Sequence, residues 1–468
     1  MSDESAKNVV PSNLEKFEQK GNWPFLLGVY MGINGTSDAY LIIDSPDCAF
    51  FKTEHIQGNH DRASDLMDCT GHHRIVNTRA DVGNIINDRR TLVQGISQEV
   101  YDDPATGGVF VTSMPMAMVT GVEYGLLTRT CQENSDVWKP AAEIPCASLA
   151  GDWLDGYADY MTAIAGSIKL SEKSKKKNTV AIIGNMMDRV EADCLANAAE
   201  LKRMVKALDL EVVSTWLDGG SIAELSRATE AEILLSLPYG REAAKYLGER
   251  TGSKVVELDL PFGLEATERW IRSLAATTGR ERQAEEFIEK ELAVVAKRLE
   301  WVIPSKLIAK RFVVAADPYL TQGMVELFRE VGADVTLAVS YGRKGHVGAE
   351  EAVETQGRTR LFHEPPLSRL HAIISEEFKG SNPPDLLIGN SQAFEASAFD
   401  WPTFLEFGYP SYRTSQVFDA PFLGFRGALW FLGEVANRIG LLETMAPFRM
   451  KPQVTQGFDV RGLLRKQS

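Results

Sequence analysis

Short apolar runs and longer amphipathic stretches alternate along most of the chain. The apolar runs are rich in Val, Ile and Leu, as expected of strands buried on both faces of a parallel sheet. A helical pattern follows most of them, which gives the strand–helix–strand order of α/β proteins. The clearest predicted strands are 179–184, 211–216, 232–236, 254–258, 311–316, 334–340 and 385–388.

Two breaks in this pattern divide the chain. A polar, basic run at 171–178 precedes the strand at 179–184, and a second break near 304–306 follows a long helical pattern over 280–301. We therefore predict an α/β fold with three Rossmann-like domains and mostly parallel sheets, over residues 1–170, 171–304 and 305–468. Loops at the carboxyl ends of the strands are then expected to enclose the functional cleft.

Composition limits the class of protein. The 468 residues are 44% hydrophobic and 24% charged, as in ordinary globular proteins. A formal net charge of −14 argues against a nucleic-acid partner, because binding to phosphate needs a basic surface. The first residues are polar, and no apolar run is long enough for a membrane span. We expect a cytoplasmic protein without membrane contact.

Familiar catalytic motifs are absent from the sequence. It has no GxxxxGK[ST] phosphate loop, so ATP hydrolysis by this chain itself is not expected. No GxGxxG follows a predicted strand, which weakens a nicotinamide-dependent function. HExxH, CxxC and GxSxG motifs are also missing, and no catalytic residue can be named.

Cys48 is the most informative residue. It follows the apolar run 41–43 and the turn Asp44-Ser45-Pro46-Asp47, at the edge where α/β sheets present ligands. Thiolates are the preferred ligands of iron–sulfur clusters. The alternative is a small buried core cysteine, because free cysteines are among the most buried residues. Cys69, in Cys69-Thr70-Gly71-His72-His73, is compatible with a zinc site, a simple turn or a position beside a redox cofactor.

Several ordered motifs of the second and third parts resemble the nitrogenase component 1 superfamily, and those of the third part resemble its beta-type subunit in particular. They are WLDGGS at 216–221, LPYGREAA at 237–244, PFGLEATE at 261–268, DLLIGNS at 385–391, FGYPSY at 407–412 and PFLGFRG at 421–427. The resemblance covers essentially the full length. It implies that the first domain binds a cluster, which receives electrons from a separate ATP-hydrolysing iron protein at a subunit interface.

The resemblance also implies specific cluster ligands. Beta subunits of the family have three cluster cysteines in the first domain, and Cys48 matches the one at the strand end. The other two positions fall near Trp23 and at Ser113, so an eight-iron double cluster is not expected. Cys146 falls where the nitrogenase beta subunit has a serine that can touch its cluster.

Two arrangements of a four-iron (4Fe-4S) cluster follow from this resemblance. In a homodimer, Cys48 and Cys146 of each chain supply four thiolates. In an alpha/beta-type heterotetramer, this chain supplies Cys48 and a homologous sister subunit supplies three cysteines. Cys146 is then a core cysteine or a neighbour of the cluster, and Cys69 is a further candidate for cofactor binding. Cys194, on a helical pattern, is expected in the core, and Cys131 has no visible partner.

The large cofactor of true nitrogenase requires a cysteine in the middle domain and a histidine in the last. Neither occurs here in the matching segments 235–239 and 406–412. A pocket lined by Phe407, Tyr409, Tyr412 and Arg413 would suit a planar carboxylate, although aromatic core packing explains the same residues. The resemblance therefore implies a beta-type subunit of a two-component reductase for a small or tetrapyrrole-like substrate. The alternatives are a non-catalytic scaffold for cluster or cofactor assembly and a structural partner that binds nothing.

Overall fold

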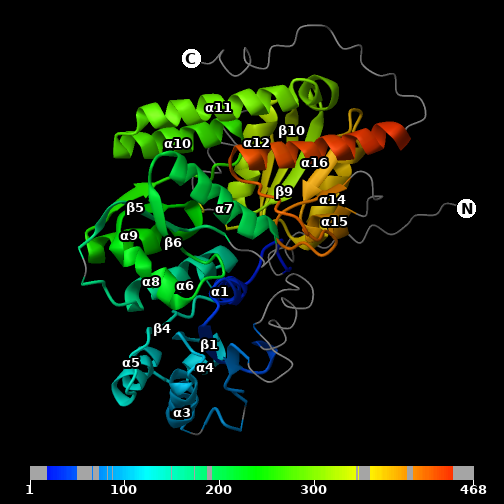
Figure 1. The fold of residues 1–468 in the computed structure, drawn as a ribbon. Coiled ribbons are helices and arrows are strands. Elements are labelled where there is room, and N and C mark those ends of the chain that lie inside the picture. The colour runs from blue at the N-terminus through cyan, green and yellow to red at the C-terminus, as the bar shows by residue number, and fades with distance from the viewer. Residues whose placement is uncertain are drawn as a thin grey trace, which may run out of the picture.

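Three parallel β-sheets, each covered by helices, make up the computed structural model (Figure 1). Every strand pair within the three sheets is parallel, which confirms the predicted α/β class. The structure describes residues 18–49, 66, 73–81, 83–86, 88–148, 150–172, 174–186, 192–343, 346, 359–397 and 404–445. None of the helices in these ranges is both long and apolar enough to cross a membrane.

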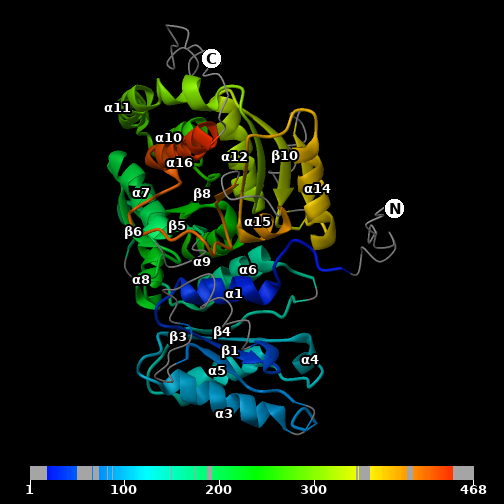
Figure 2. The same cartoon turned by 90° about the vertical axis from the view of Figure 1, so that its right-hand side faces the viewer.

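The first sheet has the order β2-β1-β3-β4 and lies at one end of the molecule (Figure 2). Its strands are β1 Ala39–Asp44, β2 Ile75–Asn77, β3 Gly108–Ser113 and β4 Ala141–Glu143. The helices of this part are α1 Phe25–Asn34, α3 Arg89–Asp102, α4 Pro115–Met118, α5 Tyr124–Asn134 and α6 Trp153–Ser167. All residues of β1 and β3 are buried, and β1 contains the apolar run 41–43 that precedes Cys48.

The second sheet has the order β6-β5-β7-β8. Its strands are β5 Lys176–Ile183, β6 Glu211–Thr215, β7 Ala231–Ser236 and β8 Lys254–Glu257. Its helical segments are α7 Ala192–Ala207, α8 Ile222–Ser226, η3 Arg227–Glu230, η4 Pro238–Gly240, α9 Arg241–Thr251, α10 Leu264–Thr278, α11 Glu281–Leu299 and the π-helical η5 Ile303–Leu307.

The third sheet has five strands in the order β11-β10-β9-β12-β13. They are β9 Arg311–Ala316, β10 Asp334–Ser340, β11 Arg360–His363, β12 Leu386–Gly389 and β13 Phe404–Glu406. The helices are α12 Pro318–Glu330, α14 Leu367–Lys379, α15 Ser391–Ser397 and α16 Gly424–Met445. Each sheet therefore draws its strands from one of the three predicted ranges, whose exact limits stay predictions.

Helices α1 and α6 form a layer between the first sheet and the other two (Figure 2). Two glycines allow them to approach closely. A Cβ atom on Gly28 would lie 1.7 Å from the carbonyl oxygen of Trp153, and one on Gly156 would lie 2.0 Å from that of Phe25. Any larger side chain at either position would force the helices apart. Gly32 on α1 is also tight, since a Cβ atom there would lie 2.3 Å from the ring of Tyr160 on α6.

Candidate functional site

The carboxyl edge of the first sheet brings together the ends of strands β1, β3 and β4. Cys48 lies four residues beyond the end of β1, Ser113 is the last residue of β3, and Cys146 lies three residues beyond β4. Strand β3 pairs with both neighbours, so the two cysteines follow the strands that flank it. Cys48 is exposed and Cys146 is partly buried. A buried core position for Cys48 is therefore wrong.

The turn that carries Cys48 is held from both sides. The Asn77 side-chain amide donates hydrogen bonds to Ser45 Oγ at 2.7 Å and to the Pro46 carbonyl at 3.1 Å. On the other side, the Tyr30 hydroxyl donates to the carbonyl of Ala49, which is fully buried, at 2.8 Å. The backbone before and after Cys48 is thus fixed while its thiol faces solvent. An exposed side chain on a fixed backbone can bind a group at little cost in conformational entropy.

A buried charge network lies at the end of β1, directly before this turn. The Asp44 carboxylate accepts a hydrogen bond from Thr78 at 2.6 Å and one from the Tyr124 hydroxyl at 2.8 Å, and it forms an ion pair with Arg89. The side chains of Asp44 and Arg89 are at most 1% exposed. Burial and the bond to Asp44 raise the pKa of Tyr124, so its hydroxyl stays a donor. Sequence reasoning missed this network, whose only signal is an acid at the end of an apolar run.

The other cysteine positions differ in their surroundings. Cys194 is 1% exposed and in the core, as predicted. Cys131 is also buried, where burial raises the pKa of its thiol to about 11, and its sulfur accepts a hydrogen bond from Gln94 at 3.2 Å. Cys69 lies outside the described residues. Among the described cysteines, the carboxyl edge of the first sheet therefore offers two thiols, those of Cys48 and Cys146.

Trp23 and Ser113 mark the positions at or near which the resemblance implies cysteines in relatives, and neither side chain carries a thiol. Ser113 is 3% exposed and pairs in register with Asp44 on β1. Trp23 precedes α1, and its carbonyl accepts a hydrogen bond from Trp153 N at 3.1 Å. Both positions belong to the protein framework around the edge.

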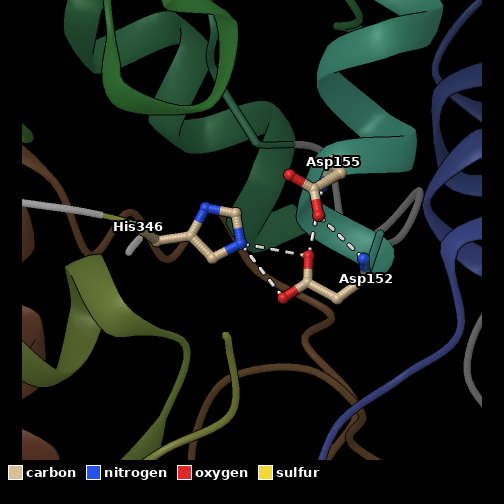
Figure 3. A group of neighbouring side chains, drawn as sticks. All are labelled: Asp152, Asp155 and His346. Carbon is tan, nitrogen blue, oxygen red and sulfur yellow. Dashed lines mark hydrogen bonds and ion pairs between the residues drawn. The ribbon is translucent and has the colours of Figure 1, made fainter. Parts of the chain in front are cut away.

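A group of ionisable side chains, Asp152, Asp155 and His346, joins the start of α6 to the third domain (Figure 3). There, the His346 ring nitrogen Nε2 lies 3.0 Å from one oxygen of the Asp152 carboxylate and 3.1 Å from the other. Burial opposes protonation of His346, but the hydrogen bond and charge of Asp152 outweigh it and raise the pKa of the imidazole. Burial alone would raise the pKa of the Asp152 carboxyl, but His346, Arg343 and Asn22 hold it well below its usual value.

Asp152, Asp155 and His346 are close enough together to be tested as a metal site, since their ligand atoms lie within 4.8 Å of one another. Donors already surround the carboxylates, however. Asp152 caps α6 by accepting from the backbone N–H groups of Leu154 and Asp155, and it also accepts from Arg343 N at 2.8 Å. The Arg343 guanidinium forms an ion pair with Asp155. The cation of this cluster is therefore supplied by the protein, and the group acts as an interdomain ion pair.

This ion pair predicts a pH-dependent contribution to stability. The raised pKa of His346 means that its contribution is complete below about pH 6.5 and is lost as the pH rises through the folded-state pKa. The lowered pKa of Asp152 means that its contribution is complete above about pH 4 and is lost in stronger acid. His346→Gln should therefore lower the unfolding free energy by about 1–3 kcal/mol between these limits. Urea unfolding of both proteins across the pH range should show the difference shrinking in alkali; a constant difference would contradict the ion pair.

A small cavity lies where the three domains meet. Its volume is about 20 Å³, enough for a single water molecule. It is lined by Trp153, Asn185, Met186, Asn197, Tyr239, Leu260, Asp317, Leu320, Tyr409, Phe422 and Leu423. Burial raises the pKa of Asp317 to about 6, although the Tyr239 hydroxyl and two backbone N–H groups donate to it. A multi-metal cofactor or a tetrapyrrole does not fit this space.

The four residues considered for a planar carboxylate differ in their surroundings. Tyr409 lines the cavity between the domains, but Phe407 packs in the core against Phe262 and Phe431. Arg413 lies over the ring of Phe394, and its backbone N–H donates to the buried Glu406 at 2.9 Å. Tyr412 N donates to Glu406 as well. Of the four residues, Tyr409 alone lines the cavity between the domains, and Glu406 at the end of β13 holds the backbone of Tyr412 and Arg413.

Comparison with known proteins gives the same fold and family. The solved structure of nitrogenase Cp1 at pH 6.5 superposes with a TM-score of 0.76 at 16% identity, over 94% of this chain and 96% of that chain. The nitrogenase molybdenum-iron protein beta chain of Crocosphaera subtropica is 24% identical over 383 residues, which are 75% of this chain and 71% of the relative.

A second kind of relative is similar at a comparable level. One subunit of the light-independent protochlorophyllide reductase of Heliobacterium modesticaldum is 23% identical over 290 residues, which are 60% of this chain and 54% of that protein. The sequence model of the nitrogenase component 1 type oxidoreductases matches residues 26–440. The match includes all three sheets and both edge cysteines. The chain therefore belongs to the nitrogenase component 1 type oxidoreductase family.

Proposed function

We propose that this chain is a beta-type subunit of a nitrogenase-like two-component reductase. In this proposal it receives electrons from a separate ATP-dependent iron protein through an iron–sulfur cluster at a subunit interface. The observation that carries the proposal is the position of Cys48 and Cys146 at the same edge of one parallel sheet. Membership of an oxidoreductase family supports it.

The residues at the edge are suited to such a cluster. Cys48 is exposed on a turn held by Asn77 and Tyr30, so its thiol can reach a group shared with a second subunit. Two thiols from each of two chains would satisfy the four ligands of a 4Fe-4S cluster, whereas three from a sister subunit would complete the set with Cys48 alone. The cluster would supply one-electron chemistry, and the protein would supply its position and shielding.

The size of the cavity between the domains favours a relay role for this chain. With room for one water molecule, it is too small for a tetrapyrrole or a multi-metal cofactor. We infer that the substrate binds outside this cavity, at the interface with the homologous sister subunit. The curated relatives include a nitrogenase chain and a protochlorophyllide reductase chain, so a small molecule and a tetrapyrrole are the two substrate classes to test.

Complex formation with an iron-protein homologue tests the proposed function. We expect the chain, with its sister subunit, to show no ATPase activity alone and to bind the homologue more tightly when a transition-state nucleotide analogue is held there. The nucleotide can strengthen binding only if it favours the docking-competent state. Sedimentation of the mixture with and without the analogue measures this. Equal affinity with and without the nucleotide analogue, or no binding at all, would contradict the reductase function.

A scaffold for cluster or cofactor assembly is the second candidate, favoured by the missing third cysteine at Ser113. A scaffold must release its cluster, whereas a relay must keep it through many turnovers. Incubation of the loaded protein with an apo-acceptor separates the two functions. Transfer of iron and sulfide to the acceptor would support the scaffold, and retention with repeated reduction and oxidation would support the relay.

A further inference from the structure

A groove on the surface of the second and third domains is formed by residues that are distant in sequence from Cys48 and Cys146. It has a volume of about 600 Å³, within the range of roughly 300–1,000 Å³ that is typical of small-molecule sites. Helices α7, α11 and α16 (Figure 1) contact one another, and together with the segment before α16 they carry the lining residues of the groove. Its lining residues are Ala196, Ala199, Glu200, Glu291, Val294, Val295, Arg298, Asp419, Pro421, Arg426, Leu429 and Trp430.

Two of the carboxylates in this groove share one arginine. Arg203 donates to both oxygens of Glu200 at 2.7 Å and to both oxygens of Glu291 at 2.8 and 2.9 Å. Burial opposes the charge of Arg203, but these hydrogen bonds outweigh it and raise the pKa of the guanidinium. The carboxylate oxygens of Glu200 and Glu291 therefore already have donors, and Arg203 compensates one of their two negative charges.

Two arginines in the groove remain available. The Arg298 guanidinium, in the last turn of α11, has no hydrogen-bond or ion-pair partner among the described residues. Arg426 reaches Glu200 only at 3.8 Å, and 63% of its side chain is exposed. Asp419 is the one lining acid without an arginine partner in the described part of the chain. Together with Arg203, the arginines of the groove balance its three acids, and Arg298 and Arg426 are the two that, within the described ranges, have no close partner and are free to bind an anion.

The remaining wall is apolar. Trp430 and Leu429 on α16 are partly buried, and Val294 on α11 is 46% exposed. A flat ring fits between such side chains, and guanidinium groups bind carboxylate, sulfonate or phosphate oxygens through two parallel hydrogen bonds. We propose that this groove is a binding site for a planar aromatic anion, held by Arg298 and Arg426 with its ring against Trp430.

Fluorescence titration with 8-anilinonaphthalene-1-sulfonate, a planar aromatic anion, tests this site. Arg298→Gln and Arg426→Gln should each weaken dye binding by about fivefold, the loss expected for one partly exposed charge-assisted contact. The uncharged probe N-phenyl-1-naphthylamine should bind both variants as it binds the wild type. Ala199→Phe, which places a ring in the groove from an exposed helix position, should reduce the binding of both probes.

Arg282→Gln is the matched control, because Arg282 lies on the same helix with 81% of its side chain exposed and does not line the groove. This variant should bind both dyes like the wild type. The proposal would be overturned by any of three results: no saturable dye binding to the wild type, equal dye affinity in the wild type and both arginine variants, or unchanged binding in Ala199→Phe. A melting curve for each variant excludes unfolding as the cause of a loss.

Discussion

Cys48→Ala is expected to remove iron and acid-labile sulfide from the protein purified anaerobically with its partner. Cys48 is exposed on a turn held by hydrogen bonds, so its replacement should change the unfolding free energy by less than about 0.5 kcal/mol. Loss of the cluster would then reflect a lost ligand and not a lost fold. Iron analysis beside a thermal unfolding scan measures both quantities. Cys194 is buried on α7 in the second domain, so Cys194→Ala is the control and should keep its iron.

Cys146→Ala separates the two ligand arrangements. If Cys48 and Cys146 of two identical chains hold one four-iron cluster, either variant leaves two of four thiolates, and iron should fall equally in both. If a sister subunit supplies three thiolates, Cys146→Ala should keep its iron while Cys48→Ala loses it. Intact iron in Cys48→Ala would reject both arrangements.

Arg89→Met should destabilise the first domain by about 3–5 kcal/mol, because it leaves the Asp44 carboxylate buried without its ion-pair partner. The neighbouring Arg90 is exposed on the same helix, so Arg90→Met is a matched control and should have little effect. Urea unfolding and hydrogen exchange of the β1 and β3 amides measure the loss. Equal stability of the two variants would contradict a structural role for the Asp44–Arg89 pair.

A double variant measures the coupling between Asp44 and Arg89 directly. Asp44→Asn removes the charge that Arg89 neutralises, so Asp44→Asn with Arg89→Met should be less destabilising than the sum of the single changes. The turn that carries Cys48 begins directly after Asp44. We therefore expect Arg89→Met also to lower iron content, although Arg89 is not a candidate ligand.

The sequence predicts the buried strands well and the peripheral ones poorly. Strands β9 and β10 begin and end where their apolar runs do, because both faces are covered. Strand β5 begins earlier than expected, since Lys176, Lys177 and Asn178 are exposed and polar and have the composition of a linker. Strands β11 and β13 are not predicted by any pattern. The first is a partly exposed edge strand that contains charged residues, and the second has three residues, so neither shows a periodic pattern.

Some features of the candidate site could be predicted from local sequence, and others could not. Cys48 could be predicted because its position depends only on the strand that precedes it. The Asp152–His346 contact joins residues 194 positions apart, and the Asp44–Arg89 contact joins residues 45 positions apart. No local pattern reports such pairs, since they depend on how domains and layers pack. The same holds for the cavity and the groove, whose walls come from different domains.

Ligation of an interface iron–sulfur cluster by Cys48 is the claim on which the proposed function depends. Its sharpest test is the iron and acid-labile sulfide content of the wild-type protein, produced with its partner subunit under iron-replete, anaerobic conditions and measured beside Cys48→Ala. We expect a brown wild-type complex with about four iron atoms for each shared cluster and a colourless Cys48→Ala complex. A colourless, iron-free wild-type complex, or a brown Cys48→Ala complex, would show that Cys48 holds no cluster.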